Sequence, residues 1–172
     1  MSQYPPLEVV DEDDNIIGEA SLEEIYKQLL IHRIVMIVVH DPGGKILLQR
    51  RSGQVSTNPN RWDVSAAGHV DAGEDYLEAA HRELQEELGV KAELKETAYY
   101  YADVELDGKH LKRFVKVYET TLPIDTNFSI DPKEVTEVRW FEPEELKTRF
   151  QQNPDEFNKD LKVVFSKLNI DI

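Results

Sequence analysis

The chain has 172 residues, of which 40% are hydrophobic and 31% are charged, and its formal net charge is −14. This length and composition are typical of one globular domain with a sizeable core, and the absence of cysteine excludes disulfides, thiolate metal sites and cysteine nucleophiles. The negative charge predicts repulsion from nucleic acids and anionic lipids, and no run of about 18 apolar residues is present. We therefore expect no nucleic-acid or membrane partner. Because the chain does not open on a basic segment followed by an apolar one, a cytoplasmic location is expected.

The first thirty residues are expected to form an N-terminal extension of two strands and a helix. The segment LEVVDEDDNIIGEA (7–20) predicts two short strands around an acidic turn at residues 14–15. The segment SLEEIYKQLL (21–30) predicts a helix, because Ser21 is an N-cap residue and Glu24 completes a capping box.

The middle of the chain predicts a hairpin, a short strand and a second helix. The segment HRIVMIVVHDPGGKILLQRRS (32–52) has two apolar runs around DPGG, which indicates a hairpin. Its run 34–39 does not alternate, so we expect burial on both faces. The segment NPNRWDVSAAGHV (58–70) predicts a loop that enters a short strand, and a helix is expected within residues 71–90.

The last third predicts another hairpin, a strand and two helices. The hairpin spans LKETAYYYADVELDGKHLKRFVKVYETTL (94–122) and turns at Asp107 and Gly108, and EVRWF is the strand. The helices are expected at EPEELKTRF (142–150), with Pro143 near its start, and at PDEFNKDLKVVFSKL (154–168). Hairpins dominate over regular strand–helix–strand alternation, which favours a mixed sheet flanked by helices in a single α/β domain over residues 1–172.

The helix expected over residues 75–88 concentrates carboxylates on one side. At about 100° per residue, one stripe is expected to face the core: Leu77, Ala80, Leu84 and Leu88. Three glutamates fall within an arc of about 100° beside that stripe: Glu83, Glu86 and Glu87.

This arrangement conflicts with helix electrostatics. Like charges three or four residues apart cost roughly 0.2–0.5 kcal/mol per pair, and Glu86 and Glu87 directly precede Gly89, the expected helix stop, where the dipole prefers cations. A divalent cation would resolve the conflict, because Mg²⁺ binds hard oxygen ligands and keeps part of its water shell. The alternative is a solvated acidic face on an acidic protein.

The surrounding spacing fits the pattern G-x5-E-x7-R-E-U-x-E-E-x-G-U, in which U is apolar. All nine specified positions over residues 68–90 match: Gly68, Glu74, Arg82, Glu83, Leu84, Glu86, Glu87, Gly89 and Val90. This segment resembles the Nudix box of the Nudix hydrolase superfamily.

The resemblance implies a fold, a reaction and a set of site residues. The fold would be an α/β/α sandwich with a mixed sheet, in which the box forms a loop–helix–loop. The reaction would be hydrolysis of a diphosphate linkage in a small molecule, such as a nucleoside diphosphate derivative, with Mg²⁺ or Mn²⁺. The metal ligands would be Glu83, Glu86, Glu87 and the carbonyl of Gly68. The loop would be braced against the helix by Glu74 and Arg82.

A further carboxylate outside the box is expected to act as base or extra ligand. Within DPKEVTEVRWF, Glu134 is the first candidate for this catalytic role and Glu137 the second. Both also read as ordinary surface glutamates.

Substrate phosphates also need cations from the protein. Arg50 and Arg51 end a strand and alternate faces, so only one can point into the cleft. Other candidates are Lys109, Lys112 and Arg113, with a solvated strand edge as the alternative for all these cations. Five aromatic residues would stack on a base or belong to the core and sheet faces: Trp62, Tyr99, Tyr100, Tyr101 and Phe114.

The N-terminal half more narrowly resembles isopentenyl-diphosphate isomerases, through EVVDEDDNIIGEA, LLIHR, ILLQRRS and NPNRWDVSAAGH. Those enzymes need a cysteine where this chain reads VSAAGH, with Ala67 before the box glycine, and a glutamate that HLKRFVKVYE lacks in its first part. They also hold a metal with several histidines. Here only His32 and His69 match, so we interpret them as structural or as substrate-phosphate contacts. The intact box favours an isomerase-like scaffold that performs hydrolysis.

Two alternatives to hydrolysis stay open from the sequence: isomerase-like chemistry and a non-catalytic Nudix protein that binds a ligand. The sequence does not identify the diphosphate substrate. It also leaves open a homodimer, for which residues 1–30 could supply the contact.

Overall fold

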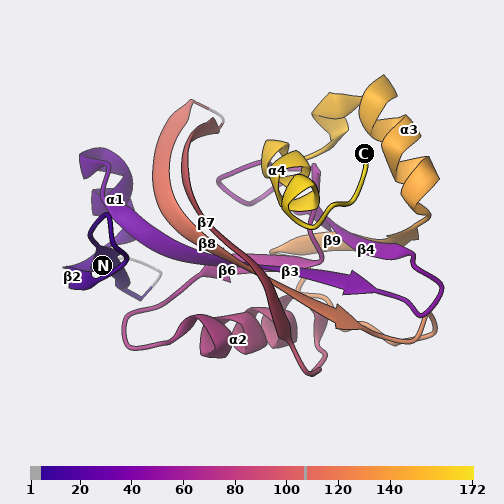
Figure 1. Cartoon of the computed structure of the whole chain (residues 1–172), viewed down its shortest axis with the longest axis horizontal. Coiled ribbons are helices and arrows are strands. Elements are labelled where there is room, and N and C mark those ends of the chain that lie inside the picture. The colour runs from indigo at the N-terminus through magenta and orange to yellow at the C-terminus, as the bar shows by residue number, and fades with distance from the viewer. Residues whose placement is uncertain (1–4, 107) are drawn as a thin grey trace.

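The computed structural model describes residues 5–106 and 108–172, which form a mixed sheet with helices on both faces (Figure 1). The strands are β1 (Leu7–Val10), β2 (Ile16–Ala20), β3 (Ile31–His40), β4 (Ile46–Arg51), β5 (Trp62–Asp63), β6 (Ala66–His69), β7 (Lys95–Leu106), β8 (Lys109–Thr121) and β9 (Val135–Phe141). The helices are α1 (Leu22–Gln28), α2 (Tyr76–Leu88), α3 (Pro143–Gln152) and α4 (Lys159–Lys167), with a 3₁₀ turn η1 (Pro154–Glu156). None of the helices in the described segments is long and apolar enough to cross a membrane.

The long strand β3 organises the sheet. It runs parallel to β8 and antiparallel to β1, β4 and β6, while β2 pairs with β1, β5 and β9 pair with β4, and β7 pairs with β8. The sheet is therefore mixed, as the hairpin-rich sequence predicts. The β7–β8 hairpin pairs up to Leu106 and Lys109, and Gly108 adopts a positive φ of 76° in its turn. Asp107, the other expected turn residue, lies outside the described residues.

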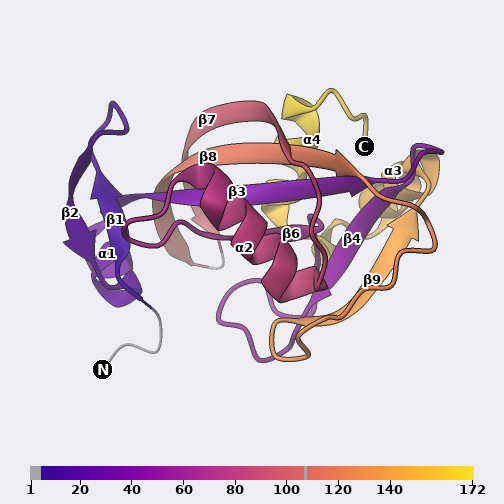
Figure 2. The same cartoon turned by 90° about the horizontal axis from the view of Figure 1, so that it is seen from below.

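Two apolar layers cover the two faces of β3. Ile34, Met36 and Val38 pack in the cluster that includes α3 and α4, whereas Val35, Ile37 and Val39 pack against α2. Every residue of the run 34–39 is at most 5% exposed, which confirms the prediction of burial on both faces. Figure 2 shows α2 crossing the face of the sheet opposite α4. The architecture is the predicted α/β/α sandwich.

The N-terminal strands and helix hold the loop that leads into α2. The capping box of Ser21 and Glu24 at α1 is present as predicted. A carboxylate oxygen of Glu8 accepts a hydrogen bond from the Gly73 amide at 3.2 Å. The Pro6 carbonyl accepts a hydrogen bond from the Ala72 amide at 3.0 Å. Arg33 binds both Glu8 and Asp14. The hairpin β1–β2 thereby fixes the loop that precedes the carboxylate helix.

The C-terminal region corrects one prediction. The single helix expected over residues 154–168 is divided into η1 and α4 by an extended pair, Phe157 and Asn158. The Asn158 side chain caps α4, and the backbone N–H of Asn158 donates to the Trp62 carbonyl at 2.8 Å. Pairing of this short segment with β5 breaks the helix. The preceding helix α3 begins at Pro143 as predicted.

Candidate active site

The helix α2 carries the predicted carboxylates and has strong signals at both ends. Asp75 caps its N-terminus and forms a capping box with Glu78. Gly89 ends it in the left-handed region at φ 69°, and a Cβ there would lie 2.7 Å from Ser129 Cβ. Glycine is therefore required at this helix stop by both conformation and space.

The core-facing stripe of α2 differs from the prediction at one position. Ala80, Leu84 and Leu88 are fully buried as expected, but Leu77 is 42% exposed, so its assignment to the core is wrong. Tyr76 faces the protein in the first turn instead, because its hydroxyl donates to Asp14 of the N-terminal hairpin at 3.0 Å.

Glu87 is buried and joined to two strands. Its Oε2 accepts hydrogen bonds from Gln49 Nε2 on β4 and from the Ala67 amide on β6, both at 2.9 Å. Burial raises the pKa of Glu87 well above its usual range, and the neighbouring charge of Glu83 raises it further. The two hydrogen bonds act in the opposite direction because they favour the ionised form.

Glu83 lies against the backbone of Gly68. A Cβ added to Gly68 would lie 1.9 Å from Oε1 of Glu83, so no other residue fits while the carboxylate keeps this position. Burial raises the pKa of Glu83 to about 7, although Arg82 acts to lower it. The predicted box residues Gly68 and Glu83 are thus in direct contact across the space between β6 and α2.

Arg82 connects the loop after β6 to the helix. Its Nε and Nη2 donate to the two carboxylate oxygens of Glu74 at 2.8 and 2.9 Å, and Nη2 also donates to the His69 carbonyl at 2.8 Å. Its Nη1 donates to Glu83 at 2.6 Å. This forked, charge-assisted arrangement links loop and helix, which is the bracing geometry expected for Glu74 and Arg82.

The side chains of Glu83, Glu86 and Glu87 do not converge on one metal position in this structure. The Glu86 side chain is 61% exposed and accepts a hydrogen bond from Nη1 of Arg82 at 3.3 Å. Glu83 is held by Arg82, and Glu87 is held by Gln49. Across residues 5–106 and 108–172, no three His, Asp or Glu side chains already stand in an arrangement that could hold a metal ion. Arg82 engages one carboxylate oxygen of Glu83 and one of Glu86.

The donor chemistry of this site nevertheless fits a divalent cation. Glu87 is buried and Glu83 is largely buried, and the negative charge of Glu83 raises the pKa of Glu87. Carboxylate and carbonyl oxygens are hard ligands of the kind that Mg²⁺ and Mn²⁺ accept. Burial favours the protonated form of these carboxylates, and a bound cation would favour the ionised form.

Arg50 and Arg51 point to different surroundings, as their alternation predicts. Arg51 donates to the Thr57 carbonyl at 3.0 Å, contacts Asp63 at 3.5 Å, and its positive charge influences the pKa values of Glu87 and His69. Arg50 is turned toward Glu137, at 4.0 Å. The charge of Arg51 therefore reaches both the carboxylates and the histidines.

The two candidates for an additional catalytic carboxylate, Glu134 and Glu137, lie in different surroundings. Glu137 is half exposed and belongs with Arg50. Glu134 is partly buried at the start of β9, and its carbonyl accepts a hydrogen bond from the Ser52 amide at 2.8 Å, just beyond the end of β4. Its backbone is thus tied to the strand that carries Gln49, and its catalytic role stays a prediction.

The histidines and aromatic residues are largely internal. His32 is 1% exposed, and its ring lies 5.4 Å from that of His69, centroid to centroid. Burial lowers the pKa of His32 to about 4 and that of His69 to about 3. Trp62 and Phe114 are buried, so they belong to the core rather than to an open stacking platform. Tyr99 stacks on Phe114 at 5.7 Å.

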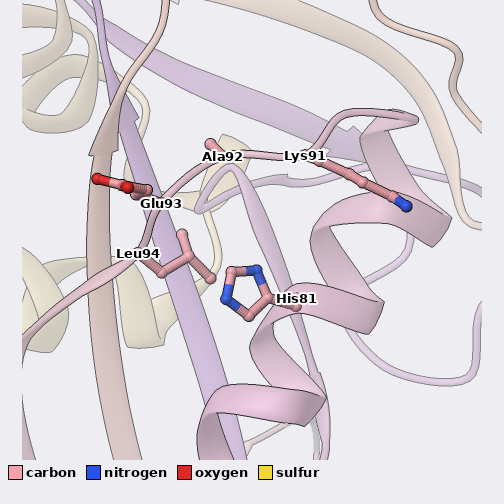
Figure 3. A pocket seen from close by; sticks show the side chains of 5 residues that line it. All are labelled: His81, Lys91, Ala92, Glu93 and Leu94. Atoms are coloured by element: carbon pink, nitrogen blue, oxygen red, sulfur yellow. The ribbon is translucent and has the colours of Figure 1, made fainter.

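Two cavities of the described residues lie away from the carboxylates. One of about 780 Å³ is lined by His81, Lys91, Ala92, Glu93 and Leu94, with the imidazole beside Leu94 (Figure 3). His81 lies roughly 120–160° around α2 from the three glutamates at 100° per residue. Another, of about 330 Å³, is polar and includes Arg50 and Glu137. Neither is lined by Glu83, Glu86 or Glu87.

Sequence reasoning missed Gln49. Its side chain is fully buried, it donates to Glu87, and within the described chain its own Oε1 has no hydrogen-bond partner. The only signal was a polar residue directly after the apolar run of β4. Nothing local to that strand shows that it would face a helix almost forty positions later.

Comparison with known proteins agrees with this geometry. Residues 30–161 match the NUDIX domain family. A Nudix hydrolase of Yersinia pestis is 36% identical over 157 residues, covering 90% of this chain and 80% of the relative. An isopentenyl-diphosphate Delta-isomerase of Serratia proteamaculans is 32% identical over 150 residues, covering 87% and 83%. A crystal structure of a Deinococcus radiodurans protein superposes with a TM-score of 0.79 and 27% identity, covering 94% of this chain and 98% of that one.

Proposed function

Because the chain belongs to the NUDIX domain family, whose hydrolases act on pyrophosphate bonds, we propose that it hydrolyses the diphosphate linkage of a small organic diphosphate with Mg²⁺ or Mn²⁺. The observation that carries this proposal is the placement of Glu83 and Glu87. Both are inward-facing carboxylates on one helix, packed against the backbone of Gly68 and Ala67.

The ligands for the cation would be Glu83, Glu86, Glu87 and the Gly68 carbonyl. When bound, a divalent cation neutralises diphosphate charge and lowers the pKa of a bound water. The cation also explains how a chain with a net charge of −14 accepts an anionic substrate.

The protein's own groups orient the carboxylates for this role. Gln49 and the Ala67 amide both bind Oε2 of Glu87, which leaves Oε1 available as a ligand or a proton acceptor. Arg82 favours the ionised form of Glu83 against burial, which raises its pKa to about 7, and Arg82 also fixes the loop that carries the Gly68 carbonyl. Arg51 supplies positive charge on the same side, suited to a substrate phosphate. Glu134 is the proposed general base.

The experiment that tests this function is a substrate panel. Purified protein with Mg²⁺ is incubated with nucleotide sugars, dinucleoside polyphosphates, oxidised nucleotides, coenzymes and isopentenyl diphosphate. Products are followed by phosphorus NMR and mass spectrometry. Monophosphate products that require Mg²⁺ are expected from at least one class, and their absence from all of them would contradict the proposal.

A second candidate is isomerisation of a C5 diphosphate, which the 32% identity to an isomerase favours. The residues argue against it. Ala67 offers no acid or base, and the position beside His32 on β8 is Arg113, a cation rather than a carboxylate. Interconversion of isopentenyl and dimethylallyl diphosphate, measured in the same panel, would establish this alternative.

A further inference from the structure

A cluster of hydrogen-bond donors lies on the other side of β6 from the carboxylates. Gly68 faces Glu83, and successive residues of a strand alternate faces, so His69 points to the opposite side. There it joins side chains from α1, β3, β7 and β8. We define the donor cluster as Tyr26, His32, His69, Tyr100 and Arg113.

The members of the donor cluster are close together. The ring of His32 lies 5.4 Å from that of His69 and 6.3 Å from that of Tyr26, between centroids. Burial is the main cause of the pKa shift of each of the four rings, and the positive charge of Arg113 contributes to all four shifts. Arg113 is therefore the common neighbour of the other four.

Part of the donor cluster lacks hydrogen-bond acceptors among the described residues. Considering the described part of the chain, neither ring nitrogen of His32 nor Nε of Arg113 has a hydrogen-bond partner, and these residues are 1% and 7% exposed. The carbonyls of Leu30 and Lys112 lie near enough to influence the pKa of His32 without reaching hydrogen-bond geometry. A buried donor without a partner destabilises the folded state. A ligand that brings acceptor oxygens would remove that destabilisation.

The charge around the donor cluster is positive although the whole chain is acidic. Three further cations surround it: Arg51, Lys109 and Lys167. The two lysine Nζ atoms lie 5.1 and 5.3 Å from the ring centroids of Tyr26 and Tyr100, and the charge of Arg51 influences the pKa values of Tyr26 and His69. With Arg113 this makes four cations. Among the described residues, two carboxylates form ion pairs with these cations: Asp160 with Arg113 and Asp63 with Arg51.

This surplus of positive charge decides between two kinds of ligand. Two adjacent imidazoles alone would suit a metal ion, but a guanidinium beside both of them repels a cation and attracts an anion. Tyrosine hydroxyls, imidazole N–H groups and arginine are all donors to oxygen. The set therefore suits phosphate or carboxylate oxygens.

We propose that the donor cluster binds an anionic, oxygen-rich group of the substrate, a phosphate or a carboxylate, at a position separate from the diphosphate that is cleaved. This inference rests on the proposed function and narrows its substrate to organic diphosphates that carry a second anionic group. Partial exposure of Tyr26, His69 and Tyr100 gives such a group access from solvent.

The test is binding of inorganic phosphate to the metal-free protein, measured by calorimetry and by the histidine ring signals in proton NMR. The double variant Tyr26→Phe with Tyr100→Phe removes two hydroxyls and keeps both rings. We expect it to bind phosphate about 10-fold or more weakly, since each charge-assisted hydrogen bond contributes on the order of one such factor. His32→Phe should weaken binding similarly.

The matched control is Tyr101→Phe. Tyr101 is the next residue of β7, is 43% exposed and packs on Phe114, so phosphate affinity should not change. The inference is overturned if wild type does not bind phosphate or acetate, or if the double variant and His32→Phe bind them as wild type does. Tighter binding of acetate than of phosphate at equal ionic strength would assign the group as a carboxylate, and the reverse as a phosphate.

The same proteins separate this inference from the proposed function. Glu87→Gln should lose hydrolysis and keep phosphate binding at the donor cluster. If the double variant hydrolyses the substrate with the KM of wild type, the anion site is disproved and the proposed hydrolase function stands. Phosphate binding that depends on the donor cluster, without hydrolysis of any substrate in the panel, would remove the function and leave the anion site.

Discussion

Gln49 Nε2 lies 2.9 Å from Oε2 of Glu87, and both side chains are buried. The pair joins a strand of the sheet to the helix that carries the carboxylates. Its hydrogen bond favours the ionised form of Glu87 against burial, which favours the protonated form. Gln49 is thus a positioning residue for the proposed chemistry.

Gln49→Leu tests that role. Loss of the donor should raise the pKa of Glu87 further and loosen its carboxylate, so kcat should fall by about 10–100-fold, the range of a misplaced acid–base or ligand group. Because the folded pKa rises, the acid limb of the rate–pH profile should move to higher pH. Gln85→Leu on the exposed side of α2 is the control. An unchanged pH profile in Gln49→Leu would show that Gln49 only fills space.

Gly68→Ala tests the contact between β6 and Glu83. The new Cβ would lie 1.9 Å from Oε1 of Glu83, so the carboxylate must move. We expect a loss of about 1–3 kcal/mol in the free energy of unfolding, as for other overpacked sites, and a smaller rise in Tm on adding Mg²⁺. The matched control is Gly18→Ala, where nothing lies within 4 Å of the added Cβ. A full Mg²⁺ response in Gly68→Ala would contradict the assignment of Glu83 as a ligand.

Arg82→Lys tests the bracing of the loop. Lysine keeps the charge but not the fork that spans both oxygens of Glu74 and the His69 carbonyl. Since the side chain is partly exposed, the expected loss in the free energy of unfolding is modest, about 1–2 kcal/mol. Chemical denaturation measures it, with Arg139→Lys, an exposed arginine paired with Glu145, as the control. Equal losses in the free energy of unfolding in both variants would mean that the forked geometry of Arg82 adds no stability beyond that of an exposed ion pair.

The raised pKa of Glu83 predicts how the metal-free protein responds to pH. A carboxyl group whose folded pKa lies above its unfolded value, about 4.3, stabilises the fold fully below that unfolded value. This contribution is lost as pH rises through its folded pKa of about 7. Tm without metal should therefore fall between roughly pH 5 and pH 8, and Glu83→Gln should reduce that fall.

Mg²⁺ should reverse this trend, because it binds ionised carboxylates. Its addition should raise Tm more at the upper end of that pH range than at the lower end. The exposed Glu93→Gln serves as a control that leaves the pH response unchanged. A Glu83→Gln protein with the same pH dependence as wild type would show that Glu83 does not titrate in this range.

The sequence predicted the parts of the site that depend on local rules. The helix stop at Gly89 and the capping box at Ser21 follow from local caps within one turn. The approach of Glu74 to Arg82 was expected from the resemblance to the Nudix box. Alternation along a strand was enough to separate Arg50 from Arg51. The buried run 34–39 followed from its lack of alternation.

The contacts that were missed depend on pairing between distant segments. Gln49 meets Glu87 only because β4 and β6 both lie beneath α2, and Gly68 needs no side chain only because Glu83 occupies that space. Arg113 was a candidate for substrate phosphate, with a solvated strand edge as the alternative. It is buried, since β8 is covered by α4 and Asp160 pairs with it. Leu77 is exposed because the N-terminal hairpin engages Tyr76 instead.

The central claim is that the carboxylates of α2 support hydrolysis by water. The most direct measurement follows the reaction in ¹⁸O-labelled water with Mg²⁺, using the first cleaved substrate and comparing wild type with Glu87→Gln. Wild type is expected to release a monophosphate product that carries the label, and Glu87→Gln is expected to form this product about 100-fold or more slowly. Labelled product at the wild-type rate from Glu87→Gln, or an unlabelled isomerised diphosphate from wild type, would contradict the central claim.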